Sequence, residues 1–211
     1  KYEVKLDDYD IKVELTAAPR SGMIRFTYPE HEESRIQIDL ARRIGGTSTE
    51  QFVEVVDNHI IRGWMKCTSE NGGWGNGAGQ ANYTIYFYCL FSRPLVDFGI
   101  WSADIPEGIS RKNAVIHPQA KVMEGKHLGF YTQFPTRKDE QVLMKCGISF
   151  VSIEGAQKNL EHDIPDWDFN KVSVCTRKMW NDALSKIKIE GNESDKTTFY
   201  TALYHTMIDP R

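Results

Sequence analysis

The sequence predicts a mainly β protein, an antiparallel β-sandwich followed by a short helical linker. Roughly a dozen short stretches of apolar residues, many alternating with polar ones, are separated by turn residues along most of the chain. The run Tyr83–Phe91 is apolar on both faces, which is typical of a central strand covered on each side. Helical spacing of apolar residues begins only after Val151. We therefore expect a sandwich domain at residues 1–152 and a helical linker at residues 153–211.

The chain opens on a predicted hairpin. Tyr2–Leu6 and Ile11–Leu15 both alternate between apolar and charged residues, and Asp8-Tyr9-Asp10 between them suits a tight turn. Alternation or apolar runs recur further along, and they predict strands at 24–28, 36–40, 52–56, 60–66, 83–91, 95–101, 128–134 and 142–152.

Helices are predicted in the last third of the chain. Glu154–Leu160 suits a short helix that Pro165 interrupts, and either Asp166 or Asp168 can cap the next one. That second helix carries a stripe of apolar residues at helical spacing: Phe169, Val172, Cys175, Met179, Trp180, Ala183, Leu184 and Ile187. A further helix is predicted at Thr197–Ile208. These helices cannot bury their own apolar faces, so they need the sandwich or additional helices.

Both ends of the sequence predict a fragment of a larger protein. The first strand starts at the first residue with no Met or leader before it, and the last helix stops almost at Pro210-Arg211. The composition, 40% hydrophobic and 26% charged over 211 residues, is that of a globular protein. The net charge of −3 comes with scattered Lys and Arg, which does not favour nucleic-acid binding. No apolar run is long enough to predict a membrane span.

The four cysteines, Cys67, Cys89, Cys146 and Cys175, are widely spaced and form no CxxC pair. We expect them to be free and buried, because unpaired cysteine behaves as a small apolar residue. No His or Cys pair has zinc-ligand spacing, so no metal ligand is assigned in this chain.

The glycine-rich segment Asn71–Gln80 (NGGWGNGAGQ) is the most unusual local feature. A predicted strand follows it instead of a helix, so it does not fit a phosphate-binding loop. It presents Trp74, whose ring could stack on a sugar or could pack against the edge of the sheet. Trp64 lies within a predicted strand and has the same two interpretations, core residue or carbohydrate-binding residue.

No catalytic group can be assigned in this chain. Inverting glycoside hydrolysis needs two carboxyl groups about 6.5–9.5 Å apart, but the acidic residues fall in predicted turns or next to helix starts: Asp7, Asp8, Asp10, Glu30, Glu32, Glu33, Asp163, Asp166 and Asp168. There is no GxSxG motif. His117 precedes Pro118, and His205 lies on the last helix, where we interpret it as a helix-packing or interface residue.

Three blocks of sequence resemble glycoside hydrolase family 92. Leu6–Pro29 contains I-x-V-E-L-T-A, then R-x-G-x-x-R, then an aromatic-Thr-aromatic-Pro sequence. Tyr86–Leu95 is similar to the family pattern YF-x-x-x-FS-K/R-P, with Arg at the basic position. Gly147–Val172 and Thr197–His205 form the third and most specific block. The blocks keep the family order and cover about half of the chain.

The resemblance implies a bacterial, exported, calcium-dependent exo-α-mannosidase that trims mannose from glycans with inversion. It also implies a galactose-mutarotase-like supersandwich, a helical linker and a C-terminal (α/α)6 barrel, with the active site between sandwich and barrel. The acid, the base and the calcium ligands would then lie mainly in the barrel, outside this chain. The Asn71–Gln80 segment and the stretch from Arg111 to Lys126 find no match in the family pattern.

The function predicted from the sequence is therefore the N-terminal part of an α-mannosidase, for example an α-1,2-mannosidase, that forms one wall of the cleft and is inactive alone. Its expected partners are mannose-containing glycans and the missing helical domain, and its expected location is periplasmic or secreted. A non-catalytic carbohydrate-binding sandwich using Trp74 and Trp64 is the alternative. A purely structural interaction domain is a third hypothesis.

Overall fold

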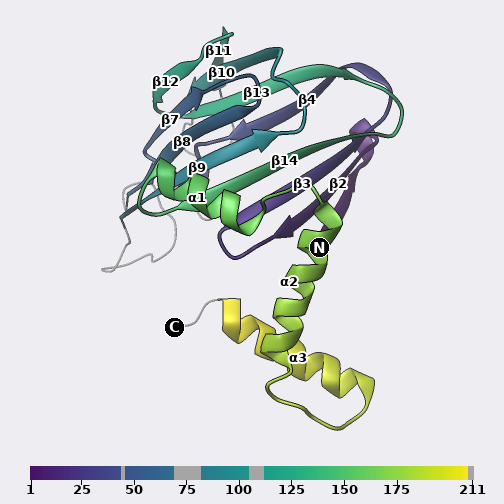
Figure 1. Cartoon of the computed structure of the whole chain (residues 1–211). Coiled ribbons are helices and arrows are strands. Elements are labelled where there is room, and N and C mark those ends of the chain that lie inside the picture. Colours follow the sequence, from purple (N-terminus) through teal and green to yellow (C-terminus); the bar gives the residue numbers. More distant parts are fainter. Residues whose placement is uncertain (44–45, 69–81, 105–111, 209–211) are drawn as a thin grey trace.

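The computed structural model of the protein describes residues 1–43, 46–68, 82–104 and 112–208. It is a two-layer sandwich with helices on one side (Figure 1). The larger sheet has the strand order β1-β2-β3-β14-β9-β8-β7-β12, and the smaller has the order β11-β10-β13-β4. Every strand pair that the structure describes is antiparallel, including a short β5-β6 ribbon. The fold class predicted from the sequence is confirmed.

The strands are β1 (Tyr2–Leu6), β2 (Ile11–Ala17), β3 (Ser21–Tyr28), β4 (His31–Asp39), β5 (Arg42–Arg43), β6 (Gly46–Thr47), β7 (Glu50–Val55), β8 (Ile60–Cys67), β9 (Tyr83–Phe91), β10 (Asp97–Asp104), β11 (Lys112–Pro118), β12 (Val122–Gly125), β13 (Leu128–Thr136) and β14 (Glu140–Ser149). The helices are α1 (Ile153–Asp163), α2 (Phe169–Leu184) and α3 (Glu193–Ile208), with a single 3-10 turn η1 (Asp7–Tyr9) in the first hairpin.

Every predicted strand is present. Four further strands were not predicted: β5 and β6, which have 2 residues each, and β11 and β12, which lie in the stretch that has no match in the family pattern. The last two were missed because β11 ends in a proline and exposes Val115 and Ile116, and β12 is only 4 residues long. The acidic pair Glu32 and Glu33 lies in strand β4, so their placement in a turn was wrong. Both are exposed because they lie at the start of β4, where burial begins only at Ser34.

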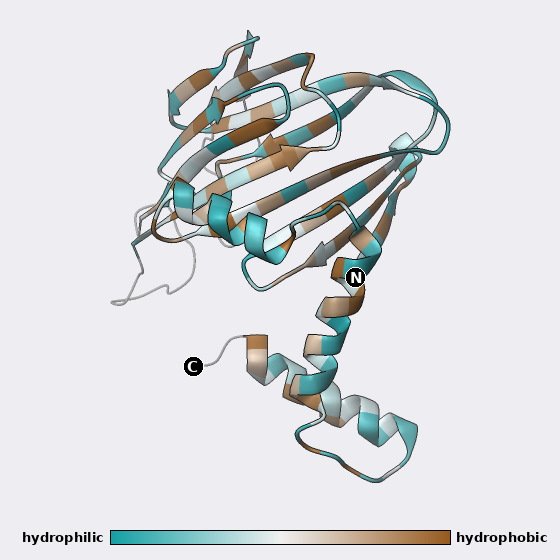
Figure 2. Cartoon of the chain, in the orientation of Figure 1, coloured by the Kyte–Doolittle hydropathy of each residue, from teal (hydrophilic) through white to brown (hydrophobic). Residues whose placement is uncertain are grey.

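The main core lies between the two sheets. Tyr28, Phe91 and Phe130 are among its largest fully buried side chains, and Phe130 packs near Phe91 and Phe98. Burial raises the pKa of Tyr28, whose hydroxyl donates to the Arg35 carbonyl oxygen at 3.2 Å. Figure 2 shows the hydrophobic residues along the strands of both layers. This core is the reason why residues far apart in the chain form one unit.

A second core lies on the opposite, outer face of the larger sheet. Met23 from β3 and Tyr88 from β9 pack there with Leu160 of α1 and with Phe169 and Val172 of α2. In Figure 1, α1 crosses the sheet over β9 and β14, while α2 and α3 extend beyond it. The larger sheet is therefore covered on both faces at its centre, which explains why β9 is apolar on both sides.

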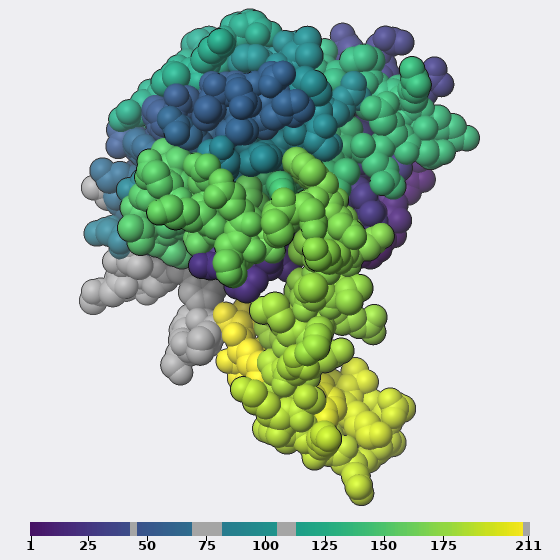
Figure 3. Space-filling view, in the orientation of Figure 1, coloured from purple at the N-terminus to yellow at the C-terminus, as the bar shows by residue number. Residues whose placement is uncertain are grey.

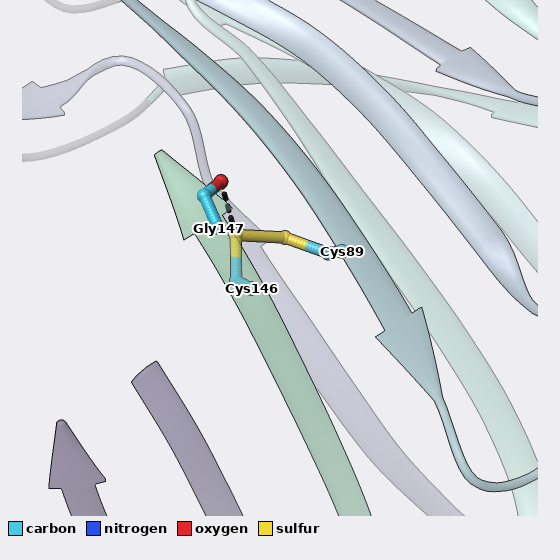
Figure 4. The surroundings of a disulfide bond; sticks show 3 residues. All are labelled: Cys89, Cys146 and Gly147. Carbon is cyan, nitrogen blue, oxygen red and sulfur yellow. Dashed lines mark hydrogen bonds between the residues drawn. A yellow bond between two sulfur atoms is a disulfide. The ribbon is translucent and has the colours of Figure 1, made fainter. Parts of the chain in front are cut away.

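The structure contains a disulfide between Cys89 and Cys146 (Figure 4). These residues face each other on β9 and β14, with Cα atoms 4.1 Å apart. The expectation of four free, buried cysteines was wrong for this pair, because strand register and not sequence spacing brings them together. It was also wrong for Cys175, which is free but exposed, whereas Cys67 is free and buried.

We predict that the disulfide contributes about 4 kcal/mol to the free energy of unfolding, because it closes a loop with a sequence separation of 57 in the unfolded chain. The double substitution of Cys89 and Cys146 by Ala should therefore lower the urea midpoint strongly, and Cys175→Ser should leave it unchanged. Mass spectrometry of the protein alkylated in denaturant without reduction should find two modified cysteines, because Cys67 is buried in the folded state. Four modified cysteines would contradict the disulfide.

Candidate functional site at the sandwich–helix junction

The first anchor between sandwich and helices is an ion pair at the end of α1. Arg20, in the turn between β2 and β3, donates from its backbone N to Asp163 Oδ2 at 2.9 Å and from Nη2 to Oδ1 at 2.7 Å. The Asp163 side chain is only 2% exposed. Burial alone would raise the pKa of Asp163, but hydrogen bonds from Arg20 and His162 outweigh it and hold that pKa below its usual range.

The second anchor joins the sheet to the start of α2. Glu14 on β2 is 3% exposed and accepts hydrogen bonds from Arg25 Nε and from Lys1 Nζ, both at 2.7 Å. The hydrogen bond from Arg25 lowers the pKa of Glu14 to about 2. The Arg25 guanidinium in turn lies 4.3 Å from the ring centroid of Phe169, the first residue of α2. A buried charge pair thus holds a cation–π contact in place.

The third anchor is Lys145 on β14, which is buried beneath the link between α1 and α2. Its Nζ donates to the carbonyl oxygens of Ile164 at 2.9 Å, Pro165 at 3.4 Å and Asp166 at 3.3 Å. It also lies 4.7 Å from the ring centroid of Trp167. Burial lowers the pKa of Lys145, against the opposing effect of the Asp166 carboxylate. The ammonium group satisfies carbonyls that follow the end of α1 and have few other partners.

Local sequence explains why the helices begin where they do. Ser152 caps α1 by accepting from the Gly155 backbone N at 3.0 Å, and Asp168 caps α2 by accepting from the Lys171 backbone N at 2.9 Å. Of the two capping residues left open by the sequence, Asp168 is therefore the cap. Close packing requires glycine at position 147, because a methyl group there would lie 2.7 Å from Leu160 Cβ.

Beyond the sandwich, α2 and α3 leave apolar side chains exposed. Val174 and Met179 on α2 are more than half exposed, and no residue of α3 is buried. Trp180 and Tyr204 pack edge to face at 4.8 Å between the two helices. His205 is exposed next to Tyr204, with ring centroids 5.8 Å apart, so its role as a packing or interface residue stays a prediction.

A groove of about 390 Å³ separates α2 from the turn between β2 and β3. It is lined by Ala17, Ala18, Pro19, Thr176, Met179, Trp180 and Ala183. The Thr176 hydroxyl donates to the carbonyl oxygen of Ala17 across its edge. The groove is mostly apolar, and its lining comes both from the β2–β3 turn and from α2.

Of the two predicted carbohydrate-binding residues, the structure describes only Trp64. Trp74 lies outside the described residues. Trp64 lies on β8, partly exposed on the outer face of the larger sheet, with its ring nearly parallel to that of Phe52. Its interpretation as a core residue is wrong, because it belongs to neither of the two described hydrophobic clusters. A sugar contact of either tryptophan stays a prediction.

The buried carboxylates of the junction form ion pairs with arginine side chains. Glu14 and Asp163 each face an arginine, so their charges are neutralised within the chain. Among the described residues, no group of three or more His, Cys, Asp and Glu side chains is placed to hold a metal ion. None of the helices in the described part is long and apolar enough to cross a membrane. The junction can position the helices on the sheet.

Comparison with known families identifies the chain. The family model described as glycosyl hydrolase family 92 N-terminal domain matches residues 1–149, well over half of the sequence. The chain belongs to glycosyl hydrolase family 92. The model of the family 92 catalytic domain matches residues 155–211. The resemblance drawn from the sequence blocks is confirmed.

Solved structures agree with this assignment. A family 92 α-mannosidase from Bacteroides thetaiotaomicron is 29% identical, with a TM-score of 0.80 over 97% of this chain. An inverting family 92 mannosidase from the same species is 22% identical, with a TM-score of 0.79 over 100% of this chain, and shows the shared fold. This chain covers only 26% of the length of each.

One curated relative also matches part of the chain. A protein of Arthroderma benhamiae named "Uncharacterized secreted glycosidase" is 36% identical over 90 residues, which is 39% of this chain and 12% of that protein. This relative is secreted by its printed name.

The family blocks acquire a structural meaning at the junction. Glu14, Arg20 and Arg25 come from the first block, and Asp163 and Phe169 come from the third. These residues are the anchors between sheet and helices. Sequence reasoning placed Asp163 at a helix boundary but assigned no role to Arg20 or Arg25. The family blocks were the only sequence signal for these residues, and they could not show that residues of the first block contact residues of the third.

We predict that Glu14→Gln lowers the free energy of unfolding by about 3 kcal/mol at neutral pH, because it leaves Arg25 buried without its partner. A carboxyl group whose pKa is depressed in the folded state stabilises the protein above its unfolded pKa, here 4.5. That contribution is lost as the pH falls from 4.5 through about 2. Urea unfolding of both proteins from pH 7 to pH 2 should show the difference shrinking over this interval. A constant difference would contradict the assignment, and the exposed Glu193→Gln serves as the control.

We also predict that Lys145→Met destabilises the protein by about 2–3 kcal/mol, because hydrogen bonds from a charged group are lost. Protection of the amides in α1 and at the start of α2 should fall in hydrogen exchange, while the main core keeps its relative protection. Lys178→Met on the exposed side of α2 is the matched control, since Lys178 pairs only with the exposed Asp182. Equal exchange in the two variants would show that Lys145 does not anchor the link.

Proposed function

We propose that this chain is the N-terminal part of an exo-acting α-mannosidase that hydrolyses terminal α-mannosides of glycans with inversion. The carrying observation is family 92 membership, together with the TM-score of 0.80 to an α-mannosidase that is 29% identical. A structure of that relative was solved in complex with mannoimidazole. α-1,2-Mannosides are one example of such substrates.

In this proposal the chain forms one wall of the cleft and does not catalyse the reaction alone. Inverting hydrolysis needs one carboxylic acid to protonate the leaving oxygen and one carboxylate to activate water. The buried carboxylates described here, Glu14 and Asp163, are held by Arg25 and Arg20 at 2.7 Å and are therefore occupied in the junction. The catalytic acid and base belong to the rest of the enzyme.

We propose a division into a sandwich domain at residues 1–152 and a helical linker at residues 153–211 that leads to an (α/α)6 barrel. The family models change between residues 149 and 155, and the last strand ends at Ser149, which supports this boundary. The exposed apolar side chains of α2 and α3 would then pack against barrel helices.

Calcium dependence is proposed for the intact enzyme and not for this chain. The described residues do not offer a group of acidic side chains that fits a calcium ion, which usually takes six to eight oxygen ligands. In this proposal the ligands of the ion belong to the helical barrel.

An exported location, periplasmic or secreted in a bacterium, is also proposed. The disulfide between Cys89 and Cys146 supports an oxidising compartment, because such bonds are rare in cytosolic proteins. The secreted relative is consistent with export.

A non-catalytic carbohydrate-binding module is the second candidate, favoured by the partly exposed Trp64. The match of residues 155–211 to a catalytic domain favours the enzyme instead. A purely structural interaction domain has no observation that favours it over these two.

An activity assay tests the proposal. The intact enzyme should hydrolyse aryl α-mannosides and α-1,2-mannobiose, release β-mannose as the first product by NMR, and lose activity with a calcium chelator until calcium is restored. The 211-residue chain should show no turnover with the same substrates. Turnover by the chain alone would overturn the proposal that the chain is not catalytic. An intact enzyme that cleaves only other glycosides would overturn the proposed α-mannosidase activity.

A further inference from the structure

Three aromatic side chains form a row across the outer face of the larger sheet. Phe52 on β7 is opposite Trp64 on β8, and Trp64 is opposite Tyr86 on β9. Residues directly opposite each other on antiparallel strands share a face, and Tyr86 packs against the second core beneath α1. The row therefore lies on the same face as α1. All three side chains are partly exposed.

The rings of Phe52 and Trp64 have nearly parallel planes, 16° apart, with centroids separated by 6.1 Å. Because neighbouring strands are about 4.8 Å apart, a row across three strands extends about 10 Å. This is comparable to the length of a disaccharide. We define this row, Phe52, Trp64 and Tyr86, as the aromatic row.

Ion pairs flank the aromatic row on both sides. Arg62 and Glu54 are opposite each other in the neighbouring row, with Nε 2.7 Å from Oε2. On the other side, Lys66 Nζ lies 3.8 Å from Glu50 Oε2. Both cations are matched by anions, and Glu124 on β12, which is opposite Phe52, adds a further exposed carboxylate. The surface therefore offers hydrogen-bonding groups and does not attract an acidic partner.

The solvent-facing side of an antiparallel sheet is usually polar, so an aromatic row at this position requires an explanation. Figure 3 shows the β7 and β8 segments (blue) open on the same side of the molecule as α1 (green), with α1 lying below them. Cross-strand aromatic pairs stabilise sheets, which accounts for part of the row. That role does not require three partly exposed aromatic side chains beside paired charges on an open surface.

We propose that the aromatic row is a non-catalytic binding surface for a neutral glycan, and specifically for a chain of α-linked mannose. Aromatic faces stack on the C–H faces of pyranose rings, and the Arg62 and Glu54 side chains lie within reach of the hydroxyl groups at the edge of a ring. This surface is separate from the anchors of the junction, which lie on β2, β3 and β14. The choice of mannose rests on the proposed function, whereas the choice of a neutral sugar rests on the surface itself.

Binding of soluble α-mannan and of mannotetraose to the 211-residue chain, measured by calorimetry, tests the proposal. Trp64→Leu should weaken binding at least tenfold, because it keeps an apolar side chain in the sheet but removes the flat ring. Trp64→Phe should retain most of the affinity. Tyr9→Leu is the control, because Tyr9 is an exposed aromatic residue in the first hairpin, on the opposite edge of the sheet from β7. Thermal unfolding of each variant separates lost binding from lost folding.

The outcomes are distinct. No binding by the chain, equal binding by Trp64→Leu and the unchanged protein, or a preference for an anionic polysaccharide would each overturn the inference. Equal loss in Trp64→Leu and Trp64→Phe, with unchanged thermal unfolding, would also overturn stacking. Failure here leaves α-mannoside hydrolysis by the intact enzyme standing. Binding of a neutral glycan other than mannan, with an intact enzyme inactive on α-mannosides, would contradict the proposed function and keep the binding surface.

Discussion

The packing of α1 and the start of α2 on the outer face of the larger sheet is the contact on which the rest of the architecture depends. It buries Met23 and Tyr88 against Leu160 and Phe169, so these apolar side chains on the outer face are covered. It also fixes the direction in which the chain leaves the sandwich. Burial of apolar side chains supplies the free energy of this packing. The three polar anchors restrict the helices to one position, because any other position would leave a buried charge or carbonyl group without a partner.

The anchors also explain why residues typical of the family need not be catalytic. Arg20 and Arg25 belong to a pattern near the beginning of the chain, yet their partners are Asp163 and Phe169 at the start of the helical part. A substitution at either arginine would act on the orientation of the helices and hence, in an enzyme with its cleft between two domains, on the alignment of the two walls. A catalytic role for Glu14 or Asp163 would require a carboxylate that is not paired with an arginine.

The two faces of the larger sheet pack against different parts of the protein. The inner face forms the main core with the smaller sheet, and a disulfide joins β9 and β14 on this face. The outer face is divided between the part covered by α1 and the open part over β7 and β8 that bears the aromatic row. One sheet thus carries the stability of the sandwich, the attachment of the helices and a surface available to a ligand.

The sequence by itself determined most of the strands, the helices and the family, because alternation, helical spacing and the three motif blocks are local signals. The run Tyr83–Phe91 even indicated a strand covered on both faces. Only the tertiary structure decided which residues distant in the sequence lie next to each other. Strand register opposed Cys89 to Cys146 and placed Trp64 in a row with Phe52 and Tyr86. Arg20 met Asp163 across 143 residues, because neighbours in a folded sheet are set by pairing order, which no spacing along the chain reveals.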